Sequence, residues 1–429
     1  MSETPRASGA GIGWRRELAS ELLRSPHSAD FVEVVAETCF AQPSALREAR
    51  AIAELWPVVP HGVKLSLASA DGLETWRARR LGALARELSA PAVSEHVALT
   101  RGGATEIGHL TAVPFTRAMV RVVARNVAAL RRHLPDVPLL LENIAWSFRP
   151  PGDEMGEGDF HAEVAEATGC PLLLDLANLY ANALNSGVPP ARLLESCPLE
   201  RVGMVHIAGG AWEDGFYADT HAHAVPEEVF ALLAALLARS GAVPVVLERD
   251  ARFPALAELA ADLARVRGLL AGRPAVLAAP PSAAVDEGPP EPVLLEQQVA
   301  LAALLTRPDA PRAAECLGIP RSDVLRTRAI LLHKRVDEAL PLLPQLSERG
   351  GGELDAVALA TVRATPRAAR AAGIVDAFAI ARAASREPPL APAARLDLLE
   401  LRSRFTRRGR PRLWTSLRST LQTSLMEAR

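Results

Sequence analysis

The chain has 429 residues, of which 49% are hydrophobic, 4% aromatic and 23% charged, and its formal net charge at pH 7 is −2. This length exceeds the size at which a single core keeps growing, so we expect one large domain and a smaller one. The near-neutral charge excludes a general attraction to nucleic acid or to membranes. Since the N-terminus has no apolar run of signal-peptide length, we expect a cytoplasmic protein. The four cysteines have no CxxC spacing, which argues against a zinc ribbon or a disulfide framework.

Short apolar runs alternate with Leu/Ala/Arg-rich segments of helical spacing over the first 250 residues or so. Strict alternation of strand and helix requires parallel strands joined by crossover helices. Eight such units are the size of a closed (β/α)8 barrel, so we predict an α/β fold of the TIM-barrel class. The eight predicted strands lie near Gly11–Gly13, Phe31–Val35, Val58–Leu67, Val93–Ala98, Val137–Glu142, Pro171–Asp175, Val202–Ile207 and Val243–Glu248.

Six consecutive predicted strands carry an ionisable residue where their apolar run ends, which in the third strand is where its polar segment starts. These residues are His61, His96, Glu142, Asp175, His206 and Glu248. Alone, each side chain is as well explained as a structural histidine or a helix cap. Together they would meet at one rim, because active sites of this fold lie at the carboxyl ends of the strands. Several buried carboxylates there would be costly without cations.

The stretch Arg201–His223 (RVGMVHIAGG and AWEDGFYADTHAH) adds further donors. A strand ends on His206, and after a Gly-Gly turn we expect a loop that carries Asp219 and His221. With Asn178, which follows Asp175 by three residues, the predicted metal ligands are His61, His96, Glu142, Asp175, Asn178, His206, Asp219, His221 and Glu248. Imidazole with carboxylate suits iron or zinc. Nine donors are too many for one ion and suit two or three ions that share a carboxylate.

The composition changes after the predicted barrel. We expect a disordered N-terminus at 1–8, the barrel at 9–272, a Pro-rich linker at 273–293 and a small all-α domain at 294–429. The tail contains a basic run, Arg402–Arg412, with six arginines in eleven residues. Such a run is usually a solvated face; the sharper hypothesis is a dock for an acidic leader peptide, and nucleic acid is a weaker third.

The motifs of the barrel resemble one known family, the multinuclear non-haem iron-dependent oxidases (MNIO), formerly DUF692. The resemblance covers residues 9 to about 270 and not the helical tail. It is carried by DFVEVVAET at Asp30–Thr38, HGVKLSLAS at His61–Ser69, SEH at Ser94–His96, LEN at Leu141–Asn143, LLLDLANLY at Leu172–Tyr180, HIAG at His206–Gly209, DTHAH at Asp219–His223 and LERD at Leu247–Asp250. Departures from the family pattern are Ala177, Gly210 and Ala222.

The resemblance implies a TIM barrel that modifies cysteines of ribosomally made precursor peptides, with mixed-valence ferrous and ferric iron, O2 and often a partner protein that presents the peptide. By position it implies one iron on His61, His96 and Glu142. A second would lie on Glu142, Asp175, His206 and Glu248, so that Glu142 is the bridge. A third would lie on Asn178, Asp219 and His221. Trinuclear zinc AP-endonuclease barrels share this partition, usually with a histidine at the position of Asn178.

Two further residues have candidate catalytic roles. His223 orients Asp219 or meets the substrate, or else it is structural. Glu37, which we place on the second strand with Glu33, points towards the mouth of the barrel and stabilises the site, although a buried and satisfied role or a surface role explains it as well.

We therefore expect an iron- and O2-dependent oxidoreductase that acts on peptidyl cysteine in natural-product maturation, with the helical domain recruiting the precursor peptide. The main alternative is a trinuclear zinc phosphodiesterase of the AP-endonuclease type, since the same donors suit either metal. A sugar isomerase and a metal-storing scaffold are weaker alternatives. Neither a membrane nor a nucleic-acid partner is expected.

Overall fold

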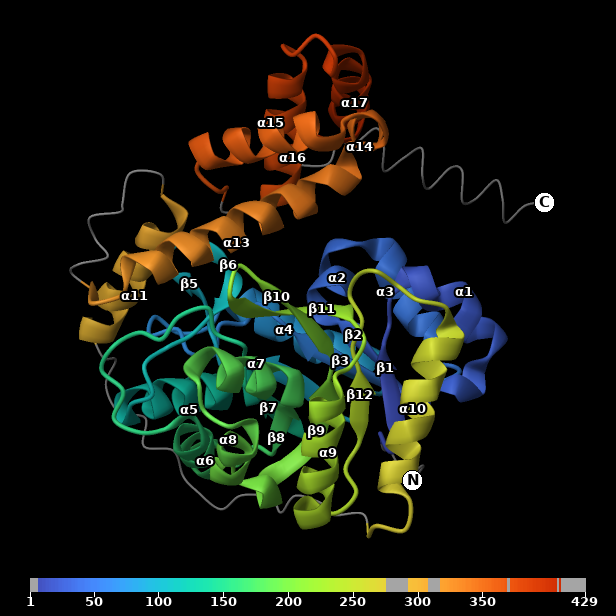
Figure 1. Cartoon of the computed structure of the whole chain (residues 1–429), viewed down its shortest axis with the longest axis vertical. Coiled ribbons are helices and arrows are strands. Elements are labelled where there is room, and N and C mark those ends of the chain that lie inside the picture. The colour runs from blue at the N-terminus through green and yellow to red at the C-terminus, as the bar shows by residue number, and fades with distance from the viewer. Residues whose placement is uncertain (1–6, 275–291, 308–316, 369–370, 407–408, 410–429) are drawn as a thin grey trace. The chain divides into compact units, whose positions relative to one another are not determined.

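The structure, a computed structural model, describes residues 7–274, 292–307, 317–368, 371–406 and 409 (Figure 1). Most of the predicted N-terminal segment 1–8, most of the predicted linker 273–293 and part of the basic run Arg402–Arg412 lie outside these residues. The chain forms two compact units, one of residues 1–100 with 110–296 and one of residues 101–109 with 297–429. The domain boundaries inferred from the sequence stay a prediction. Within the described ranges, no helix has both the length and the apolar character needed to cross a bilayer.

The first unit contains a closed barrel of eight parallel strands, so the predicted TIM-barrel fold is confirmed. Around the barrel the strands follow the order β1, β2, β3, β4, β7, β8, β9 and β12. Their bounds are β1 Ala10–Gly13, β2 Val32–Val35, β3 Val58–Gly62, β4 Val93–His96, β7 Leu139–Glu142, β8 Leu172–Asp175, β9 Val202–Ile207 and β12 Val245–Leu247.

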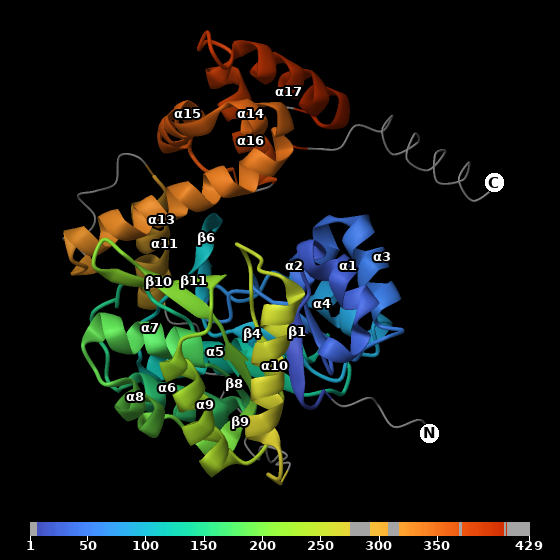
Figure 2. The ribbon, with the colours of Figure 1, turned by 45° about the vertical axis from the view of Figure 1, so that its right-hand side comes forward.

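Helices surround the barrel, and Figures 1 and 2 show α9 and α10 alongside β9 and β12. Their amphipathic faces bury Leu, Val and Ala against the outward-facing strand residues. Their bounds are α1 Arg16–Arg24, α2 Ala36–Ala41, α3 Pro43–Ile52, α4 Thr75–Glu87, α5 Arg117–Arg131, α6 Glu157–Thr168, α7 Leu176–Ser186, α8 Pro190–Ser196, α9 Glu227–Ser240 and α10 Leu256–Leu270.

The third strand is shorter than predicted. It ends at Gly62 and not at Leu67, because Ser66 adopts a left-handed conformation (φ 60°) and carboxylates capture the amides that would continue the strand. Two hairpins were not predicted. They are β5 Leu99–Gly102 with β6 Thr105–Thr111, and β10 Gly209–Glu213 with β11 Phe216–His223.

An apolar layer fills the barrel beneath the strand ends. It consists of Phe31, Val59, Ala92, Leu140, Leu173, Met204 and Val246. Successive strand residues point to opposite faces, so the residue two positions later on each strand also points inwards, one layer nearer the carboxyl end. Those residues are Glu33, His61, Ser94, Glu142, Asp175, His206 and Glu248. Gly11 makes room for this layer, since a Cβ there would lie 2.5 Å from Phe31 Cζ.

The second unit is helical, as its composition predicts. Its helices are α11 Pro292–Thr306, which begins in the first unit, α13 Arg321–Ala339, α14 Pro344–Arg349, α15 Gly351–Ala364, α16 Ala372–Ala384 and α17 Ala391–Arg404. The β5–β6 hairpin residues 101–109 cluster with these helices rather than with the barrel. The backbone of Gly102 lies so close to helix α11 that a Cβ on Gly102 would be 2.2 Å from the Gln298 carbonyl oxygen.

A buried ion pair connects three helices of this unit. Arg335 on α13 donates Nε and a terminal nitrogen to the two Asp376 oxygens on α16, at 2.9 and 2.7 Å. Its other terminal nitrogen donates to the carbonyl oxygens of Val362 and Thr365 at the end of α15. Both side chains of the pair are almost fully buried, so the charges satisfy each other without water.

Asp376→Asn should therefore destabilise the full-length chain by about 3–5 kcal/mol, because it leaves a buried guanidinium without its counter-charge. Glu400→Gln is the matched control, since it breaks the exposed pair between Glu400 and Arg404 and should cost less than about 1 kcal/mol. Chemical denaturation followed by circular dichroism measures both. Equal losses in the two variants would contradict this role of the buried pair.

Candidate metal centre

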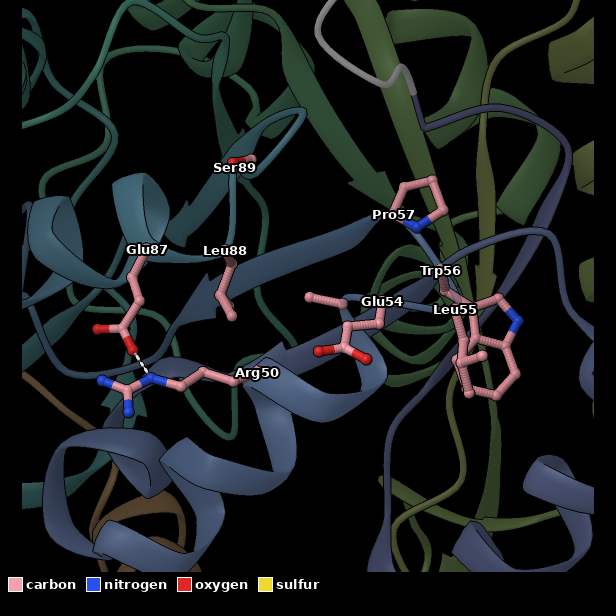
Figure 3. Close-up of a pocket in the computed structure, with 9 residues that line it drawn as sticks. Arg50, Glu54, Leu55, Trp56, Pro57, Glu87, Leu88 and Ser89 are labelled. Carbon is pink, nitrogen blue, oxygen red and sulfur yellow. Dashed lines mark hydrogen bonds and ion pairs between the residues drawn. The ribbon is translucent and has the colours of Figure 1, made fainter.

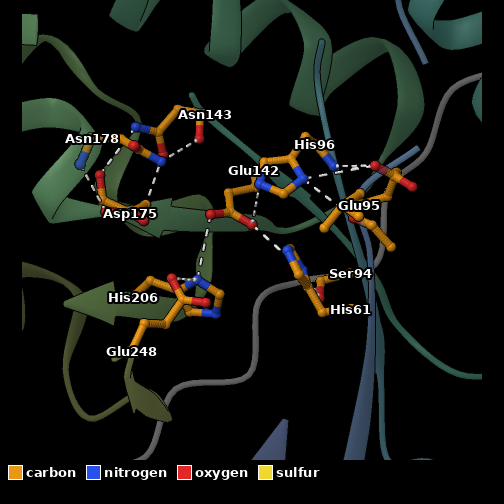
Figure 4. Close-up of polar contacts among 12 residues, drawn as sticks. His61, Ser94, Glu95, His96, Glu142, Asn143, Asp175, Asn178, His206 and Glu248 are labelled. Carbon is orange, nitrogen blue, oxygen red and sulfur yellow. Dashed lines mark hydrogen bonds and ion pairs between the residues drawn. The ribbon is translucent and has the colours of Figure 1, made fainter. Parts of the chain in front are cut away.

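Three predicted ligands meet at the ends of neighbouring strands (Figure 4). His61 is the last residue but one of β3, and His96 and Glu142 are the last residues of β4 and β7. Glu142 Oε2 lies 3.6 Å from His61 Nδ1 and 3.4 Å from His96 Nε2. All three side chains are buried, and one atom from each lies within 4.8 Å of the others. This spacing suits three ligands of one cation.

The other oxygen of Glu142 faces a second group of donors. Glu142 Oε1 lies 3.4 Å from His206 Nδ1, and that nitrogen lies 3.2 Å from Glu248 Oε2. Asp175 completes a cluster with Glu142 and His206. Since the two Glu142 oxygens face different histidines, its carboxylate has the geometry of a bridge between two cations.

The β10–β11 hairpin brings in Asp219 and His221. These residues lie on strand β11, not on a loop as predicted, because β11 pairs with β10. His221 Nε2 is 2.7 Å from Asp219 Oδ2, and His221 Nδ1 is 3.3 Å from Glu248 Oε2. His221 has φ 50°, a left-handed conformation that is rare outside glycine and costs energy, as is common at functional sites.

Asn178 lies in the first turn of α7. Its backbone N–H donates to Asp175 Oδ1 at 2.8 Å, so Asp175 also caps the helix. Its side-chain Nδ2 donates to the Asn143 carbonyl oxygen at 3.1 Å. This bond orients the amide of Asn178, whose oxygen is the atom that would bind a metal.

The buried polar atoms of this cluster are incompletely paired. Among the described residues, buried side-chain atoms that lack a hydrogen bond of suitable geometry include Glu142 Oε2, Asp175 Oδ2, His206 Nδ1, Asp219 Oδ1 and His221 Nε2. Buried polar groups are otherwise almost always satisfied. Oxygen and imidazole donors left unpaired at one place fit bound cations, so the residues present suit a multinuclear metal centre.

The charges at this centre strongly perturb one another. Burial would raise the pKa of Glu142, but the neighbouring imidazoles, His96 first, lower it to about 2. Burial would lower the pKa of His96, but Glu142 and other carboxylates raise it to about 9. Burial and then Asp219 raise the pKa of Asp175 well above its ordinary value. Without a cation, then, protons neutralise the site.

The two candidate catalytic residues lie at the edge of the cluster. Glu37 is on helix α2 and not on the second strand, which ends at Val35. Its carboxylate accepts the amides of Val63 at 3.1 Å and Lys64 at 2.9 Å, and burial followed by Glu95 raises its pKa to about 7. Glu37 thus fixes the backbone of Val63 and Lys64, which follow His61 in the chain.

His223 makes two side-chain contacts. Its Nδ1 is 3.0 Å from Thr220 Oγ1, and its Nε2 is 3.0 Å from an Arg252 terminal nitrogen. A guanidinium only donates, so Nε2 is the acceptor in the contact with Arg252. The catalytic roles of Glu37 and His223 stay predictions.

Glu33 was placed near the mouth from the sequence but was given no role. In the structure its Oε2 lies 3.1 Å from His206 Nε2, and both side chains are buried. The signal that would have found it is the alternation within β2, since Glu33 follows Phe31 of the apolar layer by two residues.

A separate cavity of about 430 Å³ lies at the opposite end of the barrel (Figure 3). It is lined by residues before β3 and at the ends of α3 and α4, among them Arg50, Trp56 and Glu87, and Arg50 pairs with Glu87. The amino ends of the strands serve stability in this fold, whereas catalytic groups lie at the carboxyl ends. We therefore place the functional site at the histidine and carboxylate cluster.

Comparison with known proteins finds relatives of the barrel. A UPF0276 protein of Streptomyces avermitilis is 43% identical over 271 residues, which are 61% of this chain and 55% of that protein. A UPF0276 protein of Chromobacterium violaceum is 35% identical over 272 residues, covering 63% of this chain and 98% of that protein. The chain thus spans about half the length of the first relative and nearly all of the second.

Among solved structures, endonuclease IV from Thermus thermophilus is similar with 20% identity and a TM-score of 0.39, covering 62% of this chain and 99% of that chain. A family model described as "RiPP precursor modification enzyme MbnB/TglH/ChrH" matches residues 9–271. That range takes in the whole barrel and all nine predicted ligands. The chain therefore belongs to the MbnB/TglH/ChrH family of RiPP precursor modification enzymes, the multinuclear non-haem iron-dependent oxidases formerly called DUF692.

Proposed function

We propose that the chain is an iron- and O2-dependent oxidoreductase that modifies cysteine residues of a ribosomally made precursor peptide. One observation carries the proposal: buried donor atoms of five strand-end and hairpin residues lack hydrogen bonds of suitable geometry and converge on one small volume, in a chain of this family. A site that only stabilised the fold would give these atoms well-aligned hydrogen bonds. Iron in this site would supply the redox chemistry with O2 and a binding position for a thiolate.

The proposed ligand set divides into three groups. The first is His61, His96 and Glu142, the second is Glu142, Asp175, His206 and Glu248, and the third is Asn178, Asp219 and His221. The clusters found at metal-ligand spacing support the first group and part of the second. A further cluster of Asp175, His221 and Glu248 joins the third group to the second. Glu142 would bridge the first two ions.

Hydrogen bonds hold the first two histidines in place. His61 Nδ1 lies 2.9 Å from Ser94 Oγ, and His96 Nδ1 lies 3.2 Å from the Gly62 carbonyl oxygen. The bond to Gly62 requires a proton on Nδ1, so the nitrogen that gives up its proton to a metal is Nε2, which faces Glu142. The chain thus presents a preorganised ligand to the metal.

We further propose that the helical unit recruits the precursor peptide, doing within one chain what a separate partner does in relatives. Its basic run Arg402–Arg412 is the hypothetical dock for an acidic leader. The family match ends at residue 271, so this unit lies outside the part that the family description covers.

The bridging role of Glu142 makes Glu142→Gln a sharp test. The variant should lose at least two metal ions per chain, because one carboxylate serves both groups, and anaerobic purification followed by metal analysis measures this. Glu157→Gln is the matched control, since Glu157 is also buried but bonds to Trp146 and Asn182 away from the cluster. Two or three irons in the wild type support the oxidase; stoichiometric zinc with nuclease activity would favour the phosphodiesterase instead.

Metal binding should release protons, and the release should fall as the pH rises. The pKa of His96 in the metal-free site is raised to about 9, so below pH 9 this imidazole carries a proton that a metal must displace. Apparent affinity for zinc should therefore rise with pH from 7 to 9.5, as His96 loses its proton. A zinc titration with an indicator dye at pH 7 and at pH 9.5 measures the release; equal release at both values would contradict the assignment.

Deleting residues 290–429 tests the role of the helical unit. The truncated chain should keep its iron but lose peptide modification, because the barrel carries all proposed ligands and the deleted part carries the proposed dock. Mass spectrometry of the peptide and metal analysis of the enzyme give the two readouts. Undiminished turnover by an iron-loaded truncated chain would refute recruitment by the helices.

A further inference from the structure

A buried carboxylate contacts the ligand histidine at the centre of the proposed site. Glu33, on β2, faces His206, on β9, across the barrel interior, and Glu33 Oε2 lies 3.1 Å from His206 Nε2. Glu33 is 3% exposed and His206 0%. A carboxylate only accepts hydrogen bonds, so this contact requires a proton on Nε2 and leaves the lone pair of the imidazole on Nδ1.

The two nitrogens of His206 have different surroundings. Nδ1 faces Glu142 Oε1 at 3.4 Å and Glu248 Oε2 at 3.2 Å, and it lacks a hydrogen bond of suitable geometry. Among the described residues, neither Nε2 nor the Glu33 carboxylate is a buried atom without a partner. The unsatisfied atoms therefore gather on the Nδ1 side, together with those of Glu142 and Asp175.

We propose that Glu33 is a positioning residue, which fixes the tautomer and orientation of His206 so that this histidine binds metal through Nδ1. The proposal rests on the ligand set of the proposed function and adds to it the binding atom of His206 and the residue that selects it. A carboxylate on the far nitrogen also makes the imidazole a stronger donor to the metal.

The backbone around Glu33 is rigid enough for this task. Glu33 pairs in register with Gly13 of β1 and with Val59 of β3, and its carbonyl oxygen accepts the Trp14 amide at 2.7 Å. Its side chain is buried directly above the apolar layer that contains Phe31. On His96 the corresponding nitrogen, Nδ1, lies 3.2 Å from the Gly62 carbonyl oxygen and 3.8 Å from Glu95 Oε1. The carboxylate contact of His206 is thus the shorter of the two, at 3.1 Å.

The distances between Glu33, His206 and Glu248 also allow a second arrangement, in which Glu33 is itself a metal ligand. Glu33, His206 and Glu248 present atoms within 4.8 Å of one another, so Glu33 could itself bind a cation with Nε2. The satisfied hydrogen bond between Glu33 and Nε2 favours positioning, whereas the unsatisfied Nδ1 favours metal on the other side of the ring. The two arrangements differ in which nitrogen touches the metal and in how many ions the chain holds at saturation.

A crystal structure of the full-length chain loaded with zinc decides between them. Zinc about 2.0–2.1 Å from His206 Nδ1, with Glu33 still on Nε2, is the expected result. Zinc on Nε2 with Glu33 as its ligand would overturn the proposal. This measurement needs neither O2 nor peptide. A chain that binds zinc through Nδ1 but does not modify a peptide would therefore refute the proposed oxidase activity but not the role of Glu33. A chain that binds no metal would refute the proposed function.

Variants at residue 33 provide an independent readout. Glu33→Gln keeps an acceptor for Nε2 without the charge, and Glu33→Ala removes both. Competition with a chelator measures the zinc affinity of each variant. The affinity should fall about 10–100-fold in Glu33→Gln and further in Glu33→Ala, because the imidazole loses the charge and then also the acceptor on Nε2. The number of zinc ions bound at saturation should not change. Glu157→Gln, the matched buried carboxylate, should behave as wild type. One fewer ion at saturation in Glu33→Gln, or wild-type affinity in Glu33→Ala, would contradict positioning. If Glu33→Ala does not fold, Glu33→Gln and the zinc-loaded structure still decide.

Discussion

The centre of this protein depends on how charge is neutralised inside a closed barrel. Glu142, Asp175 and Glu248 place carboxylates where water hardly reaches, and imidazoles face Glu142 and Glu248 at 3.2 to 3.6 Å. Leaving ionised carboxylates buried and unpaired is costly, so the site must hold either protons or cations. The perturbed pKa values of Glu142 and His96 apply to the metal-free site, in which protons balance the carboxylates. The oxygens and nitrogens that lack hydrogen bonds of suitable geometry are the atoms that cations would bind in place of those protons.

The barrel builds this centre with simple strand periodicity. One layer of apolar side chains closes the interior, and on seven of the eight barrel strands the next inward-facing residue is a donor or a partner of a donor. Because the layer below is tightly packed, the donors have little freedom to move apart. The fold thus positions its ligands on strands, and loops and hairpins only add to them.

The supporting contacts explain two departures from regular structure. Glu37 and Glu95 accept the amides of Val63, Lys64 and Leu65, so the chain turns away from the barrel directly after His61. His221 adopts φ 50° on a hairpin strand, which brings its ring between Asp219 and Glu248. In both places local strain or lost strand pairing accompanies the placement of a proposed ligand.

Much of this could be predicted from the sequence alone. Strand and helix periodicity differ, so the alternation of apolar runs with helical segments determined the TIM-barrel class and all eight barrel strands. The ionisable strand ends indicated the cluster, because the carboxyl ends of parallel strands must share one rim. Motifs such as LLLDLANLY and DTHAH were sufficient to identify the family, which the match over residues 9–271 confirms.

Only the tertiary structure decided which atoms face one another. The contact between Glu33 and His206 joins residues 173 positions apart, and no local pattern encodes which nitrogen of an imidazole meets a carboxylate. Glu37 lies on a helix and not on the predicted strand, and its carboxylate accepts the amides of two residues that follow the neighbouring strand β3, a contact that no local pattern reveals. Likewise the β5–β6 hairpin joins the helical unit, because close packing of Gly102 against α11 depends on residues nearly 200 positions away, which no local pattern reveals.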